Sequence, residues 1–113
     1  MKKDPKIFLE HIKDSIVLIE EYSKGAVKSE FIKNRALQDA VIRRLEIIGE
    51  AVKNLPLSFR AQHPEIPWKQ MAGMRDILIH EYFDVDLVLA WQVVKHELPP
   101  IKKRLLELLE AKK

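Results

Sequence analysis

The length and composition of the chain limit the classes of protein to which it can belong. Its 113 residues, of which 47% are hydrophobic and 33% charged, fit a single domain over 1–113 with one core and a well-solvated surface. The 20 basic and 17 acidic residues give a formal net charge of +3, which permits nucleic-acid binding without demanding it. With no cysteine, no signal-peptide pattern and no apolar run near the about 20 residues that cross a bilayer, we expect a cytoplasmic protein without disulfides or membrane contact.

Apolar residues at helical spacing predict two helices in the first half of the chain. The first begins at Asp4 and Pro5, a capping residue followed by the residue preferred at the first helical position, and it ends near Gly25. The second is predicted from Ser29, as its cap, to about Leu55. Its apolar stripe repeats every three or four residues, as one face of a helix requires.

Prolines divide the second half of the chain. Pro56 ends the second helix, a short helical turn follows, and a third helix is expected over 67–80, opened by its proline. Asp84 or Asp86 then caps a fourth helix, and the proline pair 99–100 kinks that helix or divides it from a last amphipathic segment. No run alternates with period two for long enough to indicate a strand. The predicted fold is an all-α, up-and-down bundle of four to five helices.

One segment carries a distinctive set of reactive side chains: Arg75, then after four residues His80, then after one residue Tyr82. Arginine is a permanent cation whose planar fork suits phosphate oxygens, and histidine titrates near neutrality and can move a proton. These two groups suffice for RNA cleavage without a metal, because His80 can take the proton of a ribose 2′-hydroxyl while Arg75 stabilises charge on the phosphate. DNA lacks that nucleophile. The histidines are too scattered to suggest a metal site, and no cofactor is expected.

The spacing within this segment leaves its geometry open. Residues five apart on a regular helix lie about 140° apart around the axis, so Arg75 and His80 do not share a face. Either the helix ends near Ile79, or the two groups converge from different chains across a two-fold axis. Asp76 does share a face with His80 and could hold the imidazole in one tautomer. Taken alone, the pattern is also compatible with a surface ion pair and a boundary histidine.

The context of these residues, AGMRDILIHEYFDVD, resembles the HepT-like toxin family of the HEPN superfamily. The segments RALQDAVIRRLEIIGEAVKNLP and DLVLAWQVVKHELPPIKKRLLEL are similar to that family too, so the resemblance covers nearly the whole chain. It implies a helical homodimer with the motifs of both chains at a shared cleft, acting as a ribonuclease toxin on RNA. It also implies a partner, an MNT-type nucleotidyltransferase antitoxin. By that resemblance Arg75 and His80 are catalytic, and Tyr82 accepts AMP from ATP, which silences the toxin.

Asp76 departs from the family pattern, because many HEPN nucleases have asparagine after the arginine. A carboxylate there would repel RNA or pair with Arg75. This keeps a second hypothesis open, a non-catalytic helical dimer that binds a nucleotidyltransferase. A purely structural bundle would leave the combination of Arg75, His80 and Tyr82 unexplained, although Tyr82 could simply be a partly buried aromatic residue.

Other residues bear on partners rather than on chemistry. A homodimer is expected because apolar residues cover two sides of the second helix and, with the two tryptophans, exceed what a four-helix bundle of this size needs. Two-fold dimers are also the commonest oligomers. Trp68 and Trp91 are interpreted as core or dimer contacts before base-stacking platforms. Arg43 and Arg44 could extend a phosphate-binding surface, but solvated helix charge is the more ordinary interpretation.

Overall fold

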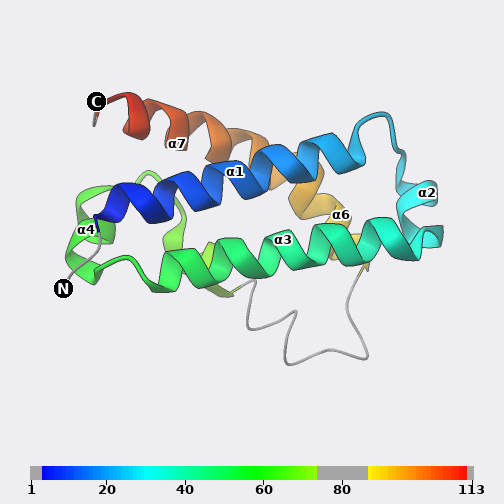
Figure 1. Ribbon diagram of the computed structural model, residues 1–113, viewed down its shortest axis with the longest axis horizontal. Helices are drawn as coiled ribbons and strands as arrows, with labels where there is room; N and C mark the ends of the chain where they lie inside the picture. The colour runs from blue at the N-terminus through cyan, green and yellow to red at the C-terminus, as the bar shows by residue number, and fades with distance from the viewer. Residues whose placement is uncertain (1–3, 74–86, 112–113) are drawn as a thin grey trace.

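Three long helices form the frame of the molecule. The computed structural model describes residues 4–73 and 87–111, and every regular element within these ranges is helical. Helices α3 (Arg35–Lys53) and α7 (Leu98–Ala111) both pack against α1 (Pro5–Ser23), and both run antiparallel to it (Figure 1). The prediction of an all-α, up-and-down bundle is therefore confirmed for the part of the chain that the structure describes.

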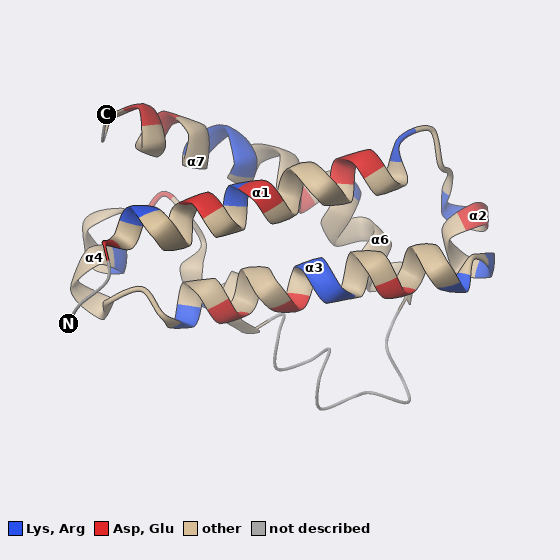
Figure 2. Cartoon of the chain, viewed as in Figure 1, with Lys and Arg blue, Asp and Glu red and all other residues tan. Residues whose placement is uncertain are grey.

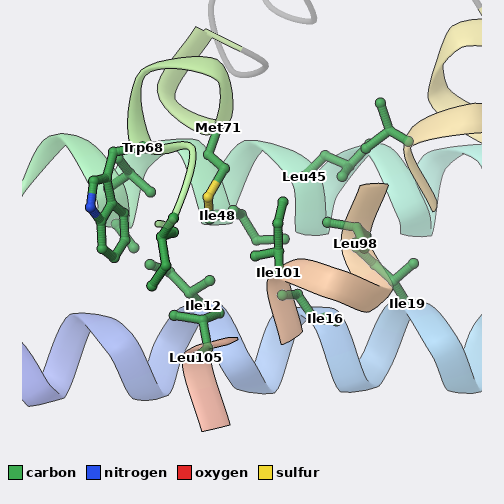
Figure 3. Packing of buried hydrophobic residues seen from close by; sticks show 14 of the residues in the cluster. Ile12, Ile16, Ile19, Leu45, Ile48, Trp68, Met71, Leu98, Ile101 and Leu105 are labelled. Carbon is green, nitrogen blue, oxygen red and sulfur yellow. The ribbon is translucent and has the colours of Figure 1, made fainter. Parts of the chain in front are cut away.

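The core is aliphatic and lies where these three helices meet. The α1 residues Leu9, Ile12, Ile16 and Ile19 are completely buried, at the three- and four-residue spacing that the sequence shows. They face buried residues of the other two helices, among which Figure 3 labels Leu45, Ile48, Leu98, Ile101 and Leu105. Burial of each such side chain contributes about 1.5–3 kcal/mol, which makes this cluster the main source of stability.

Helix α1 begins and ends where its sequence predicts. The Asp4 carboxylate accepts a hydrogen bond from the backbone N–H of Lys6 at 2.9 Å, and Pro5 is the first helical residue. Beyond the helix, Gly25 has a φ of 76°, in the left-handed region that favours glycine. Both predicted ends are confirmed.

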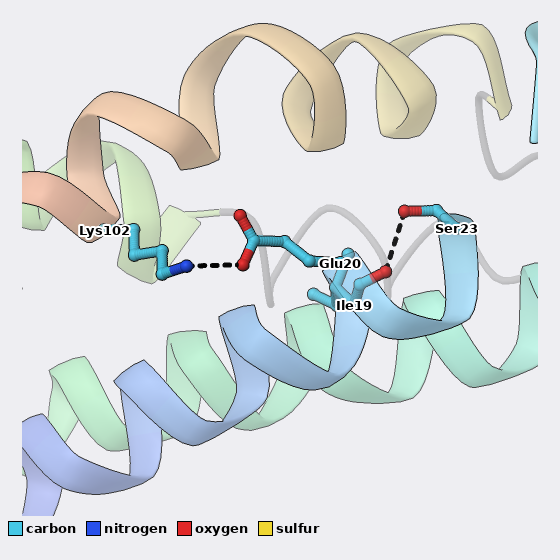
Figure 4. A network of polar contacts seen from close by, with 4 residues as sticks. All are labelled: Ile19, Glu20, Ser23 and Lys102. Carbon is cyan, nitrogen blue, oxygen red and sulfur yellow. Dashed lines mark hydrogen bonds and ion pairs between the residues drawn. The ribbon is translucent and has the colours of Figure 1, made fainter. Parts of the chain in front are cut away.

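Two polar contacts lie near the end of α1, and one of them reaches α7. The Ser23 hydroxyl is buried and donates to the Ile19 carbonyl at 2.8 Å, while Lys102 Nζ of α7 lies 2.8 Å from Glu20 Oε1 (Figure 4). The ion pair is partly exposed, so its contribution is at most about 1 kcal/mol. It serves to align the two helices more than to hold them together.

The single second helix predicted from Ser29 to about Leu55 is wrong, because two helices occupy that range. Helix α2 (Lys28–Lys33) already includes Ser29, and Asn34 interrupts the run with extended backbone before α3 begins. The Asn34 side chain caps α3 by accepting the N–H of Leu37 at 3.0 Å. Gln38 donates through its amide nitrogen to the carbonyls of Phe31 and Ile32, at 2.9 and 2.8 Å. The break is stable because these two side chains satisfy backbone groups that an uninterrupted helix would have paired.

Two shorter helical segments follow α3. Helix α4 (Leu57–Gln62) begins after Pro56 and buries Phe59. The chain is helical again from 68 to 73, and 73 is the last residue of the first described range. The third helix was predicted to open at Pro67, but Pro67 lies just before it and supplies the carbonyl that accepts the N–H of Met71 at 3.0 Å.

The proline pair 99–100 neither divides the last helix nor ends it. Helix α6 (Leu87–Gln92), a π-helical turn η2 (Val93–Glu97) and α7 follow one another without a break. In η2 the N–H of Leu98 donates to the carbonyl of Val93, five residues earlier. Since proline donates no N–H and its ring clashes with the carbonyl four residues before it, a widened turn accommodates both prolines where a regular α-turn would not. The predicted cap at Asp84 or Asp86 lies outside the described residues.

Within residues 4–73 and 87–111, no helix combines the length and the apolar character that crossing a bilayer requires.

Candidate functional site

The four predicted site residues, Arg75, Asp76, His80 and Tyr82, all lie in the segment 74–86, which is outside the described residues. Their roles and their convergence therefore stay predictions. What the structure describes is the framework at both ends of this segment, which we call the motif segment.

The helix that leads into the motif segment is firmly anchored. Trp68, at its start, is only 6% exposed, and its indole N–H donates to the His63 carbonyl at 2.8 Å. The Trp68 ring lies 6.3 Å from the ring of Phe59 in α4, centroid to centroid. Met71, two residues before the end of the described range, is completely buried in the core (Figure 3). Helix 68–73 is thus fixed to both α4 and the core.

The helix that leads out of the motif segment, α6, is anchored against α2. Ala90 of α6 is buried, and the half-buried ring of Trp91 lies 5.2 Å from that of Phe31 in α2. Lys95 Nζ lies 4.7 Å from the centroid of the Trp91 ring, within the range of a cation–π interaction. Packing of α6 on α2 therefore sets the direction in which the chain leaves the motif segment.

A side-chain contact joins the two anchors directly. The Gln70 amide nitrogen of helix 68–73 lies 2.6 Å from Glu97 Oε1 in η2, and the two residues are 27 positions apart in the sequence. The bond occurs at an exposed position, so it orients the two elements and adds little stability. No sequence signal could have found it, because neither residue type nor spacing indicates the pairing.

The surface charge of the described helices is mixed. Figure 2 shows basic and acidic residues interspersed along α1 and α3, whereas on α7 a basic block (102–104) precedes the acidic residues. Arg43 is exposed and Arg44 half-buried on α3, and neither forms an ion pair with another described residue. On α1, hydrogen bonds to Glu10 and Asp14 raise the pKa of the Lys13 ammonium above its ordinary 10.5. Within the described ranges, no three His, Asp or Glu side chains gather as a metal site would require.

Both tryptophans pack in or against the core, which is one of the two roles predicted for them. Trp68 belongs to the core, as expected, and therefore offers no surface to a second chain, which removes one of the reasons for expecting a dimer. Trp91 is half-buried, and it contacts the ring of Phe31 and the ammonium group of Lys95. Neither ring is placed as an open platform for base stacking.

The described structure defines a class of protein, a small helical bundle that holds an arginine–histidine–tyrosine segment between two anchored helices. Comparison with known proteins identifies the family within this class. The model of the family "Ribonuclease HepT-like" matches residues 12–108, a range that includes the motif segment. The chain belongs to the HepT-like family, as its motifs predicted.

Individual relatives agree with this membership. A protein of Thermococcus cleftensis named "Probable ribonuclease HepT" is 50% identical over 102 residues, which cover 90% of this chain and 93% of the relative. A "Putative RNase" of Caldanaerobacter subterraneus is 46% identical over 111 residues, 98% of this chain and 99% of the relative. A Methanocaldococcus jannaschii protein named "Gamma-glutamylcyclotransferase and putative RNase" is 56% identical over 110 residues, but the chain spans only about half of its length. No solved structure matches.

Proposed function

We propose that this protein is a metal-independent endoribonuclease toxin whose catalytic groups are Arg75 and His80. The observation that carries the proposal is the match of the HepT-like family over residues 12–108, which includes both of these residues. The names of relatives that align over nearly their full length support an RNA substrate.

In the proposed reaction each group has one task. The His80 imidazole takes the proton from a ribose 2′-hydroxyl, and the resulting oxygen attacks the adjacent phosphorus. The bond from phosphorus to the 5′-oxygen breaks, and that oxygen takes a proton from water as it leaves. Arg75 directs its planar fork at the phosphate oxygens, where negative charge builds up in the transition state. The products are a 2′,3′-cyclic phosphate and a free 5′-hydroxyl.

The separation of Arg75 and His80 favours a dimeric site. If the helix that starts at 68 continues regularly through 80, the two side chains lie about 140° apart and cannot meet on one phosphate within one chain. Two motif segments related by a two-fold axis would place the arginine of one chain beside the histidine of the other. With a regular helix the proposed active form is a homodimer, whereas a helix that ends near Ile79 would let the two groups meet within one chain.

RNA cleavage by the purified protein in EDTA tests this proposal. We expect a cyclic-phosphate product, and we expect His80→Ala to lower the rate by about 10²–10⁴-fold, as for a general acid–base residue. His96→Ala is the matched control, because His96 is an exposed histidine on η2 and should leave the rate unchanged. Activity that vanishes in EDTA and returns with magnesium, or that survives His80→Ala, would contradict the mechanism.

We also propose that a nucleotidyltransferase antitoxin silences the toxin by transferring AMP from ATP to the Tyr82 hydroxyl. The added phosphate and adenosine would block RNA by charge and by bulk beside Arg75 and His80. Intact-mass spectrometry after incubation with such an antitoxin and ATP should show AMP on the wild type and none on Tyr82→Phe. Tyr22→Phe is the control, because Tyr22 is an exposed tyrosine on α1. Unchanged modification of Tyr82→Phe would show that another residue is the acceptor.

Asp76 supports one alternative, a non-catalytic dimer that binds a nucleotidyltransferase. A carboxylate next to Arg75 can neutralise the cation that the phosphate needs. Asp76→Asn separates the two functions, because it removes the charge and keeps the size of the side chain. Faster cleavage in Asp76→Asn would show that the wild type is a weakened enzyme, whereas absence of cleavage in both proteins would favour the binding module.

A further inference from the structure

An open cavity of about 890 Å³ lies between α4, helix 68–73, α6 and η2. It has no part in the mechanism proposed above. Its walls come from both anchors of the motif segment, since Gly73 immediately precedes that segment and Leu89 follows it by three positions. We call it the anchor cavity.

The lining of the anchor cavity is mainly apolar. Leu57 and Leu89 present large apolar surfaces to solvent there, at 74% and 43% exposure, while the nearly buried Trp68 and Val93 close it from the protein side. A volume of this size, with apolar and aromatic walls and a few polar groups, is typical of sites for small molecules. A polynucleotide would need a row of cations, which this lining does not offer.

The polar groups of the lining have the chemistry of an anion site. Among the described residues, neither Arg60 nor Lys69 forms an ion pair, and the buried Arg60 Nε has no hydrogen-bond partner there. The acidic group of the lining, Glu97, already has Oε1 bonded to the Gln70 amide at 2.6 Å. Arg60 and Lys69 thus bring two cations to the lining against the single carboxylate of Glu97, so a ligand with an anionic head would be favoured there.

We propose that the anchor cavity binds a small amphipathic anion, with an apolar body against Leu57 and Leu89 and a carboxylate, sulfonate or phosphate head on Arg60. Such a ligand would touch the helices at both ends of the motif segment. We expect such a ligand to change the rate of RNA cleavage, a consequence that rests on the function proposed above. The binding itself does not depend on that function.

The probe for binding is 8-anilinonaphthalene-1-sulfonate, an aromatic body with one sulfonate, followed by its fluorescence in the absence of RNA. We expect one site per chain. We expect Arg60→Gln to weaken binding about tenfold, the scale of one charge-assisted hydrogen bond, and Leu89→Ser to weaken it severalfold. Decanoate should displace the probe better than decanol, because only decanoate carries the anionic head.

Two matched variants separate the cavity from general surface effects. Leu106 of α7 is 44% exposed, close to the 43% of Leu89, and Arg43 is an exposed arginine on α3. Leu106→Ser and Arg43→Gln should bind the probe as the wild type does, and far-UV circular dichroism should show that all four variants are folded. Equal affinity in Arg60→Gln and the wild type, or equal displacement by decanol and decanoate, would overturn the proposal.

Other occupants give distinct results. If Leu89→Ser changes the molar mass in light scattering without changing probe affinity, the cavity is a contact between copies of the chain and the proposal is wrong. Displacement of the probe by a short RNA, lost in Arg60→Gln, would overturn it in favour of a substrate site. His80→Ala should retain probe binding, so failure of the ribonuclease proposal and failure of this one can be told apart.

Discussion

Replacement of Trp68 by phenylalanine tests how strongly the helix leading into the motif segment is anchored. The substitution keeps an aromatic ring in a position that is only 6% exposed but removes the indole N–H that donates to the His63 carbonyl at 2.8 Å. His63 is partly exposed, so water can reach its carbonyl, and loss of this bond should cost about 1–1.5 kcal/mol. The smaller ring leaves space beside Phe59 in a packed region, which adds about 1 kcal/mol.

The expected loss in the free energy of unfolding is therefore about 2–2.5 kcal/mol. For a domain of this size it corresponds to a fall in Tm of about 8–10 °C, at about 4 °C per kcal/mol. Urea unfolding followed by far-UV circular dichroism measures the first quantity and a thermal scan the second. Neither depends on tryptophan fluorescence, which the substitution itself would change.

Trp91→Phe is the internal comparison, because Trp91 is half-buried and its ring can be replaced by another aromatic ring on Phe31. Trp91→Phe should mainly weaken the cation–π interaction with Lys95, because phenylalanine is a poorer partner than tryptophan. The expected loss in the free energy of unfolding is about 0.5–1 kcal/mol. If Trp68→Phe destabilises the protein no more than Trp91→Phe does, the indole hydrogen bond is not an anchor and the account of helix 68–73 is wrong.

Four further predictions follow from the backbone and from the proposed site. Asn34→Ala should destabilise the protein by about 1 kcal/mol in urea unfolding, because it removes the cap of α3; no change would show that Gln38 alone holds the break. Gly25→Ala should cost about 1–2 kcal/mol in the same assay, because φ is 76° there, although the space around it is open. Arg75→Lys should slow RNA cleavage about tenfold or more, because lysine lacks the planar fork; wild-type rates would reduce Arg75 to a simple charge. Light scattering at micromolar concentration should give the mass of a homodimer, and a monomeric mass would contradict the shared site.

The ends of α1 could be predicted because their signals are local. Asp4 and Pro5 cap and open the helix through neighbouring backbone groups, and Gly25 supplies a conformation that other residues avoid. The break at Asn34 was missed because the apolar pattern continues across it. Asparagine before an apolar run was a usable capping signal there, but the backbone bonds of Gln38 to Phe31 and Ile32 depend on the bend itself.

For the candidate site, the sequence indicates residue types and leaves their arrangement open. Arg75, His80 and Tyr82 stand out because few structural roles require those three groups together. The contacts that frame them, Trp68 with His63 and Gln70 with Glu97, depend on how α4, helix 68–73 and η2 meet in space. Apolar periodicity along the chain does not indicate which elements contact one another, so these contacts could not be predicted from the sequence.

The π-helical turn η2 also sets the rotational phase between α6 and α7. Each residue of an α-helix turns the chain by about 100° around the helix axis. A π-helical turn accommodates one extra residue, so it rotates the side chains of α6 by about that angle relative to those of α7. Deleting one residue from Val93–Glu97 would restore ordinary phase. It would swing Trp91 about a quarter of a revolution away from Phe31, while α7 stayed seated on α1. The orientation of the helix that follows the motif segment therefore depends on the number of residues in η2, about ten positions downstream. It does not depend on any reactive side chain.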